Sequence, residues 1–125
     1  MTENTKTAVL LIAHGSRRAE ANAELVRLAE LVRETGRYPI VETAYLEVTQ
    51  PTIPEGAKVC IERGAASVRM MPYFLSPGVH AINDLEEFRS RFEQEYPGVE
   101  FSVCQPLGLH PKLVDVVLAR LEEVD

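Results

Sequence analysis

Short apolar runs alternate with amphipathic stretches along the whole chain. The run at residues 7–13 has the near-continuous hydrophobicity of a strand buried on both faces, and further strands are expected at residues 40–46, 67–74 and 99–104. A helix-like segment follows each run, and proline or glycine marks most of the boundaries. This β-α-β-α-β-α-β-α order predicts an α/β fold, a three-layer sandwich with a four-stranded, mainly parallel sheet flanked by helices.

The expected helices carry their apolar residues on one face. In segment 18–35 the spacing i, i+3, i+4, i+7 groups Leu25, Leu28, Ala29 and Val32. The corresponding residues after the third run are Ile82, Leu85, Phe88 and Phe92. The last helix opens at His110-Pro111, and its spacing predicts a buried stripe of Leu113, Val117 and Leu121.

The second helix is expected to open at Thr49-Gln50-Pro51-Thr52. Proline suits a first helical turn because its missing N–H would have no partner there. Pro54 then also lies in that turn, and Gly64 ends the helix. The proline and glycine within residues 49–56 make the start of this helix the least regular of the four.

Length, charge and hydropathy exclude several classes of protein. The 125 residues suit one α/β domain, so we expect a single domain over residues 1–125 with residues 1–6 frayed. The net charge is −6 and no run is rich in Lys or Arg, which argues against a nucleic-acid partner. The apolar run at residues 8–13 is too short for a signal peptide or a membrane span.

The two cysteines, Cys60 and Cys104, stand far apart and form no CxxC pair. Without a secretory signal, we expect two reduced structural thiols and a cytoplasmic location. A disulfide between the two residues is the alternative.

Three polar residues stand at the carboxyl ends of the first three expected strands: His14, Glu47 and His80. Parallel strands lie about 5 Å apart, and ligands of such sheets bind beyond the carboxyl ends of the strands. Imidazole and carboxylate together suit cobalt, nickel, zinc or iron(II), and imidazole also accepts protons near neutral pH. The three residues therefore predict a metal site, while each one taken alone is equally typical of an ordinary strand-end or loop residue.

Four motifs resemble the class II tetrapyrrole chelatases, specifically the short CbiX/SirB type of sirohydrochlorin chelatase. They are LLIAHGSR at residues 10–17, AYLEVTQP at 44–51, MPYFLSPGVH at 71–80 and PLGLHP at 106–111. The resemblance runs from about residue 8 to residue 121. The His-Gly-Ser-Arg and Phe-Leu-x-x-Gly-x-His motifs, in this order, are its most specific part.

The resemblance implies insertion of cobalt, iron or nickel, as Co²⁺, Fe²⁺ or Ni²⁺, into sirohydrochlorin without ATP or another nucleotide. Cobalt is the metal we favour. His14 and His80 match the family histidines that bind metal and remove protons, and Glu47 matches an acidic residue near the metal. Larger relatives have two similar lobes around the tetrapyrrole, so this chain is expected to act as a homodimer with no membrane partner.

We expect further residues in or beside these motifs to contact the polycarboxylate substrate: Ser16, Arg17, Arg18, Tyr45, Phe74, Leu75 and Gly78. Arg17 and Arg18 stand at a helix N-terminus, where the dipole also favours anions. Ser16 is a candidate helix cap. Solvated helix-start arginines are the alternative interpretation.

Two residues are given structural roles. His110 precedes a helix-opening proline and follows the fourth strand, away from the other histidines. Asp84 is displaced from the family aspartate and is assigned no role beyond possible helix capping.

Two other functions compete. A histidine phosphatase-like hydrolase would also place His-Gly after a strand, but it needs an arginine before the histidine, and Ala13 stands there. A carrier that binds metal or tetrapyrrole without turnover would use the same residues. Turnover of many equivalents of sirohydrochlorin separates an enzyme from a carrier.

Overall fold

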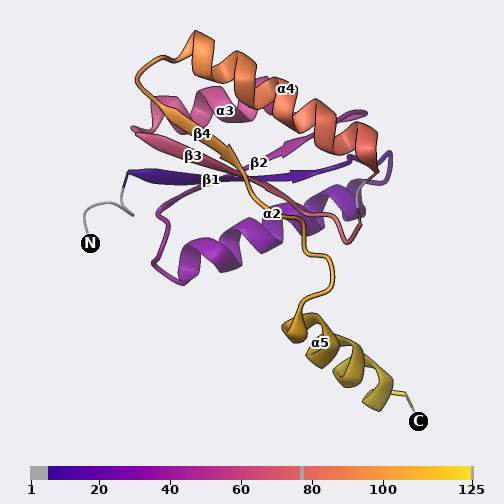
Figure 1. Ribbon diagram of the computed structural model, residues 1–125. Helices are drawn as coiled ribbons and strands as arrows, with labels where there is room; N and C mark the ends of the chain where they lie inside the picture. The colour runs from indigo at the N-terminus through magenta and orange to yellow at the C-terminus, as the bar shows by residue number, and fades with distance from the viewer. Residues whose placement is uncertain (1–5, 77, 125) are drawn as a thin grey trace.

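The computed structural model describes residues 6–76 and 78–124 (Figure 1). Its elements are β1 (Thr7–Ala13), α2 (Ala19–Glu34), β2 (Ile40–Tyr45), α3 (Ile53–Glu62), β3 (Ser67–Pro72), α4 (Val79–Glu95), β4 (Glu100–Val103) and α5 (Pro111–Glu122). Within these described residues, no helix combines the length and the apolar character needed to cross a bilayer. Strand and helix alternate as the sequence predicts.

The sheet has the strand order β2-β1-β3-β4, and every neighbouring pair is parallel. Helix α2 covers one face, while α3 and α4 cover the other (Figure 1). The predicted three-layer α/β fold is therefore confirmed. All four strands end at the same edge, which is where loops of a parallel sheet form ligand sites.

The core has two parts, one on each side of β1. Leu10 and Ile12 of β1 are fully buried toward α3 and α4. Val9 and Leu11 of the same strand pack against Leu25 of α2. Burial on both faces explains why the β1 sequence is continuously apolar rather than alternating.

Helix α3 begins later than its prolines suggest. Thr52 is the N-cap: its hydroxyl accepts a hydrogen bond from the Glu55 N–H at 3.3 Å, and the Glu55 carboxylate accepts one from the Thr52 N–H at 2.8 Å. The expected start at Thr49-Gln50-Pro51-Thr52 is wrong because this reciprocal capping box fixes the first helical residue as Ile53. The expectation that Pro54 lies in the first turn is confirmed.

The predicted burial of the last helix is wrong. Helix α5 has no buried residue, and Val117 and Leu121 are 52% and 65% exposed. Figure 1 shows α5 projecting away from the sheet on the segment that follows β4. The apolar spacing of Leu113, Val117 and Leu121 makes the helix amphipathic, but no other part of the described chain covers it.

Cys60 and Cys104 are both free thiols, which agrees with the expectation of two reduced cysteines and not with the alternative of a disulfide. Cys60 is fully buried in α3, and this burial raises the pKa of its thiol to about 12. Burial also raises the pKa of the Cys104 thiol.

Candidate functional site

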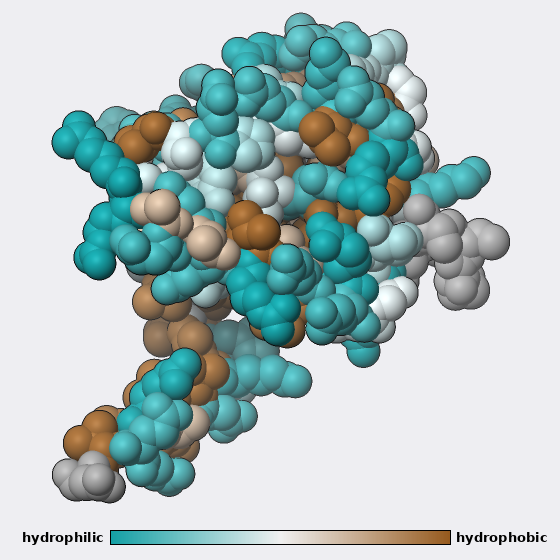
Figure 2. All heavy atoms as spheres, turned by 180° about the vertical axis from the view of Figure 1, so that it is seen from behind, coloured by the Kyte–Doolittle hydropathy of each residue, from teal (hydrophilic) through white to brown (hydrophobic). Residues whose placement is uncertain are grey.

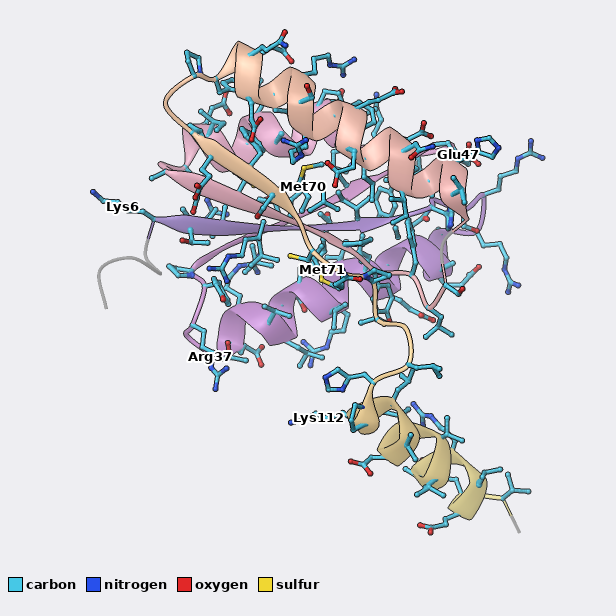
Figure 3. All side chains as sticks on the ribbon, in the orientation of Figure 1. Lys6, Arg37, Glu47, Met70, Met71 and Lys112 are labelled. Carbon is cyan, nitrogen blue, oxygen red and sulfur yellow. The ribbon has the colours of Figure 1, made fainter. Side chains whose placement is uncertain are left out.

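The loops after β1 and β2 continue the pairing of the two strands beyond their ends. The Leu46 N–H donates to the Ala13 carbonyl at 2.9 Å, and the Glu47 N–H donates to the His14 carbonyl at 3.0 Å. His14 and Glu47 are therefore backbone neighbours at the carboxyl-end edge of the sheet. In Figure 3, Glu47 lies at this edge and Lys6 lies at the opposite one.

Gly15 allows these two loops to approach. Its φ of +99° is left-handed, and a Cβ atom built there would lie 2.0 Å from the Glu47 carbonyl oxygen. No L-residue with a side chain fits this arrangement without moving Glu47. The glycine after His14 thus fixes the spacing between the first two candidate ligands.

The His14 imidazole stacks on the ring of Phe74, with 4.3 Å between centroids and 22° between planes. Phe74 follows β3 and is only 6% exposed, whereas His14 is exposed. Among the described residues, no protein group hydrogen-bonds to the His14 ring nitrogens. Stacking on Phe74 therefore holds the plane of the imidazole ring, and its two nitrogens remain able to bind a metal ion or a proton.

Glu47 is followed by a strained turn. Val48 has a φ of 77°, and the Thr49 N–H donates to the Glu47 carbonyl at 2.9 Å across it. A β-branched residue in this conformation costs on the order of 1–3 kcal/mol, and such strain concentrates at functional sites. The turn leaves the Glu47 side chain exposed beyond the sheet edge.

His80 is the second residue of α4, after the N-cap Gly78, and it is exposed. The structure thus places His14, Glu47 and His80 on the loops and helix start at one sheet edge. In the part of the chain that the structure describes, no three His, Cys, Asp or Glu side chains are grouped closely enough to hold a metal ion. The three-ligand metal site therefore stays a prediction.

Tyr45 does not face an open site. It is 3% exposed, and its hydroxyl donates to the Asn22 carbonyl at 2.7 Å. Burial raises the pKa of this phenol. The ring packs in the core beneath α2, so the structure does not bring Tyr45 to the exposed residues of the site, and its substrate contact stays a prediction. Phe74 is likewise covered, since its ring lies against His14.

Ser16 does not serve as the N-cap of α2, which is Arg18. Its hydroxyl instead accepts from the Arg18 N–H at 3.0 Å, just before the helix. Asn22 clasps the Ser16 backbone from both sides, accepting from its N–H at 2.9 Å and donating to its carbonyl at 2.7 Å. Sequence analysis missed Asn22, a residue that holds the loop after His14 and whose only signal is an amide in the first turns of a helix.

The remaining predicted contact residues are accessible. Arg17 and Arg18 are exposed at the N-terminus of α2, and Arg18 pairs with Glu20 at 3.2 Å in solvent. Leu75 is 60% exposed, and Gly78 is exposed. These placements leave a substrate role open for all four, and an exposed ion pair is easily exchanged for a ligand carboxylate.

His110 has a structural role, as expected. It is the N-cap of α5, and its Nδ1 atom accepts from the Lys112 N–H at 3.1 Å.

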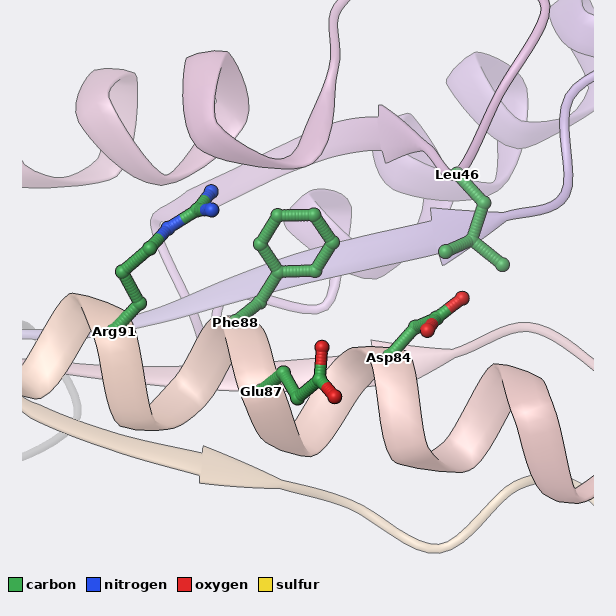
Figure 4. A pocket seen from close by; sticks show the side chains of 5 residues that line it. All are labelled: Leu46, Asp84, Glu87, Phe88 and Arg91. Atoms are coloured by element: carbon green, nitrogen blue, oxygen red, sulfur yellow. The ribbon is translucent and has the colours of Figure 1, made fainter.

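Asp84 is not a helix cap, because it lies in the second turn of α4. Together with Leu46, Glu87, Phe88 and Arg91 it lines a pocket of about 340 Å³ between α4 and the end of β2 (Figure 4).

The CbiX family model matches residues 8–124, which is nearly the whole chain. The chain belongs to the CbiX family. The resemblance inferred from the four motifs is therefore confirmed.

The named relatives of this chain fall into two length groups. Some are about twice as long as this chain, and others have about the same length. The chain is 35% identical to a chloroplastic sirohydrochlorin ferrochelatase of Arabidopsis thaliana, covering 91% of this chain and 51% of the relative. It is 30% identical to a sirohydrochlorin cobaltochelatase of Methanocaldococcus jannaschii, covering 90% of this chain and 96% of that relative. The chain thus spans about half the length of the first relative and nearly all of the second.

A solved structure agrees with the fold. The sirohydrochlorin chelatase SirB of Bacillus subtilis subspecies spizizenii, in complex with cobalt, superimposes with a TM-score of 0.86 at 30% identity. The match covers 96% of this chain and 51% of SirB. This CbiX chain therefore corresponds to about half of the longer chelatase.

Proposed function

We propose that this protein inserts a divalent metal ion into sirohydrochlorin, with the metal as a substrate. The observation that carries the proposal is the His14 ring, held by Phe74 with its nitrogens free at the sheet edge shared with Glu47 and His80. Two relatives that match at least 90% of this chain are named as sirohydrochlorin chelatases, and one of them has a similar length. Their names support the same activity.

In the proposed reaction, His14 and His80 hold the metal, and Glu47 completes a site that keeps positions open for exchange. The tetrapyrrole loses two pyrrole protons as the metal–nitrogen bonds form, so the products are the metallated tetrapyrrole and two protons. An imidazole accepts these protons near neutral pH. No oxidation state changes, so the reaction needs no redox cofactor, and the proposed mechanism uses no ATP because the metal and proton transfers are assigned to the two histidines and Glu47.

Charge provides a further argument for where the substrate lies. Sirohydrochlorin is a polycarboxylate and the chain has a net charge of −6, so binding requires a local cationic surface. Arg17 and Arg18 form such a surface three and four residues after His14, at the N-terminus of α2. We propose that these arginines bind substrate carboxylates, while Leu75 and Gly78 line the opposite side.

We favour cobalt as the metal and place the reaction in the cytoplasm. Imidazole and carboxylate also accept iron(II) and nickel, with affinities ordered mainly by the metal itself. Relatives named for cobalt and for iron are both similar to this chain. Insertion rates with Co²⁺, Fe²⁺ and Ni²⁺, measured on the same preparation, determine the preference.

The test follows the absorbance of sirohydrochlorin during metal insertion. We expect wild type to turn over many equivalents, and expect His14→Ala, His80→Ala and the double variant to lose most or all of this activity. His110→Asn is the matched control, because asparagine retains the N-cap of α5 while removing the third histidine.

Two outcomes contradict the proposal. Full turnover in the double variant excludes the histidine mechanism. A wild-type reaction that stops near one equivalent per chain identifies a carrier in place of an enzyme.

A further inference from the structure

The loop of residues 14–18 carries the first candidate metal ligand and buries none of its side chains. On the face of the molecule shown in Figure 2, hydrophilic residues cover most of the surface, while apolar side chains gather along the protruding α5. Apolar packing therefore does not fix the main chain of this loop. Its conformation depends on hydrogen bonds, and one side chain from outside the loop supplies two of them.

That side chain is Asn22, which bonds both main-chain groups of Ser16. Its Oδ1 atom accepts from the Ser16 N–H at 2.9 Å, and its Nδ2 atom donates to the Ser16 carbonyl at 2.7 Å. A residue in an antiparallel strand offers the same two groups to its partner, so the carboxamide holds Ser16 as a neighbouring strand would. Asparagine provides both the acceptor and the donor, whereas aspartate keeps only the acceptor and leucine has neither. We call these two hydrogen bonds the Asn22 clamp.

The residue that makes the clamp is itself held by the sheet. Helix α2 begins without a side-chain hydrogen bond from its N-cap, Arg18, and the ends of helices fray. Asn22 lies in the first turns of this helix, but its carbonyl accepts from the Tyr45 hydroxyl at 2.7 Å. Tyr45 is 3% exposed at the end of β2, so a fixed side chain of the core holds Asn22 in place.

The clamp completes the restraint of three consecutive residues. The His14 carbonyl accepts from the Glu47 N–H at 3.0 Å, and Gly15 lies so close to the Glu47 carbonyl that no Cβ fits between them. Ser16 is the third residue, and Asn22 holds it from the side of α2. Because a side chain starts from its own main chain, these contacts together limit where the His14 ring nitrogens point.

The clamped residue also lies between the candidate metal ligand and the arginines for which substrate binding is proposed. The Ser16 hydroxyl accepts from the Arg18 N–H at 3.0 Å, and Arg17 lies between the two. Holding Ser16 therefore fixes the spacing between His14 and these two cations. Insertion requires the metal and the macrocycle to meet in one geometry, and a misplacement of about 1 Å can slow an enzyme reaction about a hundredfold.

We propose that Asn22 is a positioning residue: it holds Ser16 so that His14 keeps the direction in which it binds the metal. Both polar groups of its side chain are occupied by Ser16, so it acts through the loop and not on the reacting atoms. The inference rests on the proposed function for its effect on sirohydrochlorin, while its effect on His14 is measurable with the metal alone.

The first experiment measures cobalt affinity by calorimetric titration. Asn22→Leu removes both hydrogen bonds with a side chain of similar size, and Asn22→Asp keeps the acceptor but loses the donor. We expect the affinity to fall by about tenfold or more in Asn22→Leu, the usual cost of losing a group that supports a metal ligand, and by less in Asn22→Asp. Gln94→Leu is the matched control, because it removes an exposed amide near the far end of α4.

The second experiment asks whether Tyr45 acts through the clamp. Tyr45→Phe removes the hydroxyl that holds Asn22, and we expect a smaller loss of cobalt affinity in the same direction. In the Asn22→Leu background the clamp is already absent, so Tyr45→Phe should have no further effect. This lack of additivity is a result that a general loss of stability does not produce.

The third experiment follows insertion of cobalt into sirohydrochlorin. Rates are compared under conditions in which denaturation curves show every variant to be folded, so a change in global stability does not enter them. We expect kcat/KM to fall by about 10- to 100-fold in Asn22→Leu and to stay at the wild-type value in Gln94→Leu.

Two results overturn the proposal. One is a cobalt affinity in Asn22→Leu equal to that of wild type, and the other is a full additional effect of Tyr45→Phe in the Asn22→Leu background. If wild type binds cobalt but does not metallate sirohydrochlorin, the proposed function fails, and the cobalt comparison still decides whether Asn22 positions His14.

Discussion

The rings of His14 and Phe74 stack at a centroid distance of 4.3 Å, which joins the loop after β1 to the loop after β3. The ring of Phe74 is almost inaccessible, so this aromatic residue acts on the histidine and not directly on the solvent side of the site. The loop after β3 therefore holds the ring of a candidate metal ligand that follows β1.

Replacing Phe74 by leucine tests this dependence. We expect the turnover number for metal insertion to fall by about 2- to 10-fold, since an aromatic pair contributes about 0.5–1.5 kcal/mol beyond its buried area. Phe74→Tyr should retain most of the rate. Phe88→Leu is the control, because Phe88 also stacks on a neighbour, Phe92, but lies away from the histidines. Equal kinetics for the two leucine variants would remove the positioning role.

Gly15→Ala is expected to destabilise the protein far more than Gly36→Ala. Both glycines have positive φ, so both substitutions carry the left-handed penalty of about 1–2 kcal/mol. Only at residue 15 would the new Cβ lie 2.0 Å from the Glu47 carbonyl, while nothing lies within 4 Å at residue 36. Urea denaturation of the two variants measures the difference, and similar losses would mean that the Glu47 loop moves freely.

Glu47→Gln tests the carboxylate as a metal ligand. The substitution removes the charge of the carboxylate with little change in shape. We expect the affinity for cobalt to fall by more than about tenfold, because loss of a residue that only supports a metal ligand already costs about tenfold or more. Calorimetric titration of cobalt into the protein measures this change. Glu62→Gln is the control, an exposed carboxylate at the end of α3. Unchanged cobalt affinity in Glu47→Gln leaves the two histidines as the only candidates.

The buried thiol of Cys60 predicts a loss of stability at high pH. Desolvation by burial, with a contribution from Glu42, raises its pKa from 9.0 to about 12 in the folded protein. The folded state therefore holds the proton more tightly, so the contribution is complete below about pH 9 and is lost as pH rises from 9 toward 12. The slope is up to about 1.4 kcal/mol per pH unit.

Denaturation of wild type and Cys60→Ala at pH 8, 9, 10 and 11 checks this effect. The difference in unfolding free energy between the two proteins should shrink with rising pH. A constant difference would show that the thiol does not titrate on unfolding.

The strands and their layers were predictable because burial leaves a direct trace in the sequence. The β1 run is apolar from Ala8 to Ala13, where two helical layers enclose it. The stripe of Leu25 and Ala29 likewise identified the inner face of α2. These patterns depend on local spacing alone, which a single sequence contains.

The start of α3, the covering of α5 and the direction of Tyr45 depend on interactions that the spacing of apolar residues in the sequence does not describe. The start of α3 is set by the Thr52–Glu55 capping box and not by Pro51. The stripe of α5 indicates an apolar face but does not say which surface covers it, or whether that surface belongs to the same chain. Tyr45 lies in a matching motif, yet its direction follows the pleat of β2 and takes it into the core.

The two contacts from residues 107 and 108 to the loop of Phe74 are made entirely by main-chain atoms. Alanine scanning would leave both hydrogen bonds in place, so such a screen would miss the residues that join the segment before α5 to the loop of Phe74. Only loss of an amide hydrogen breaks the tie. Leu107→Pro removes one of the two donors and is therefore a change that would reveal this contact genetically.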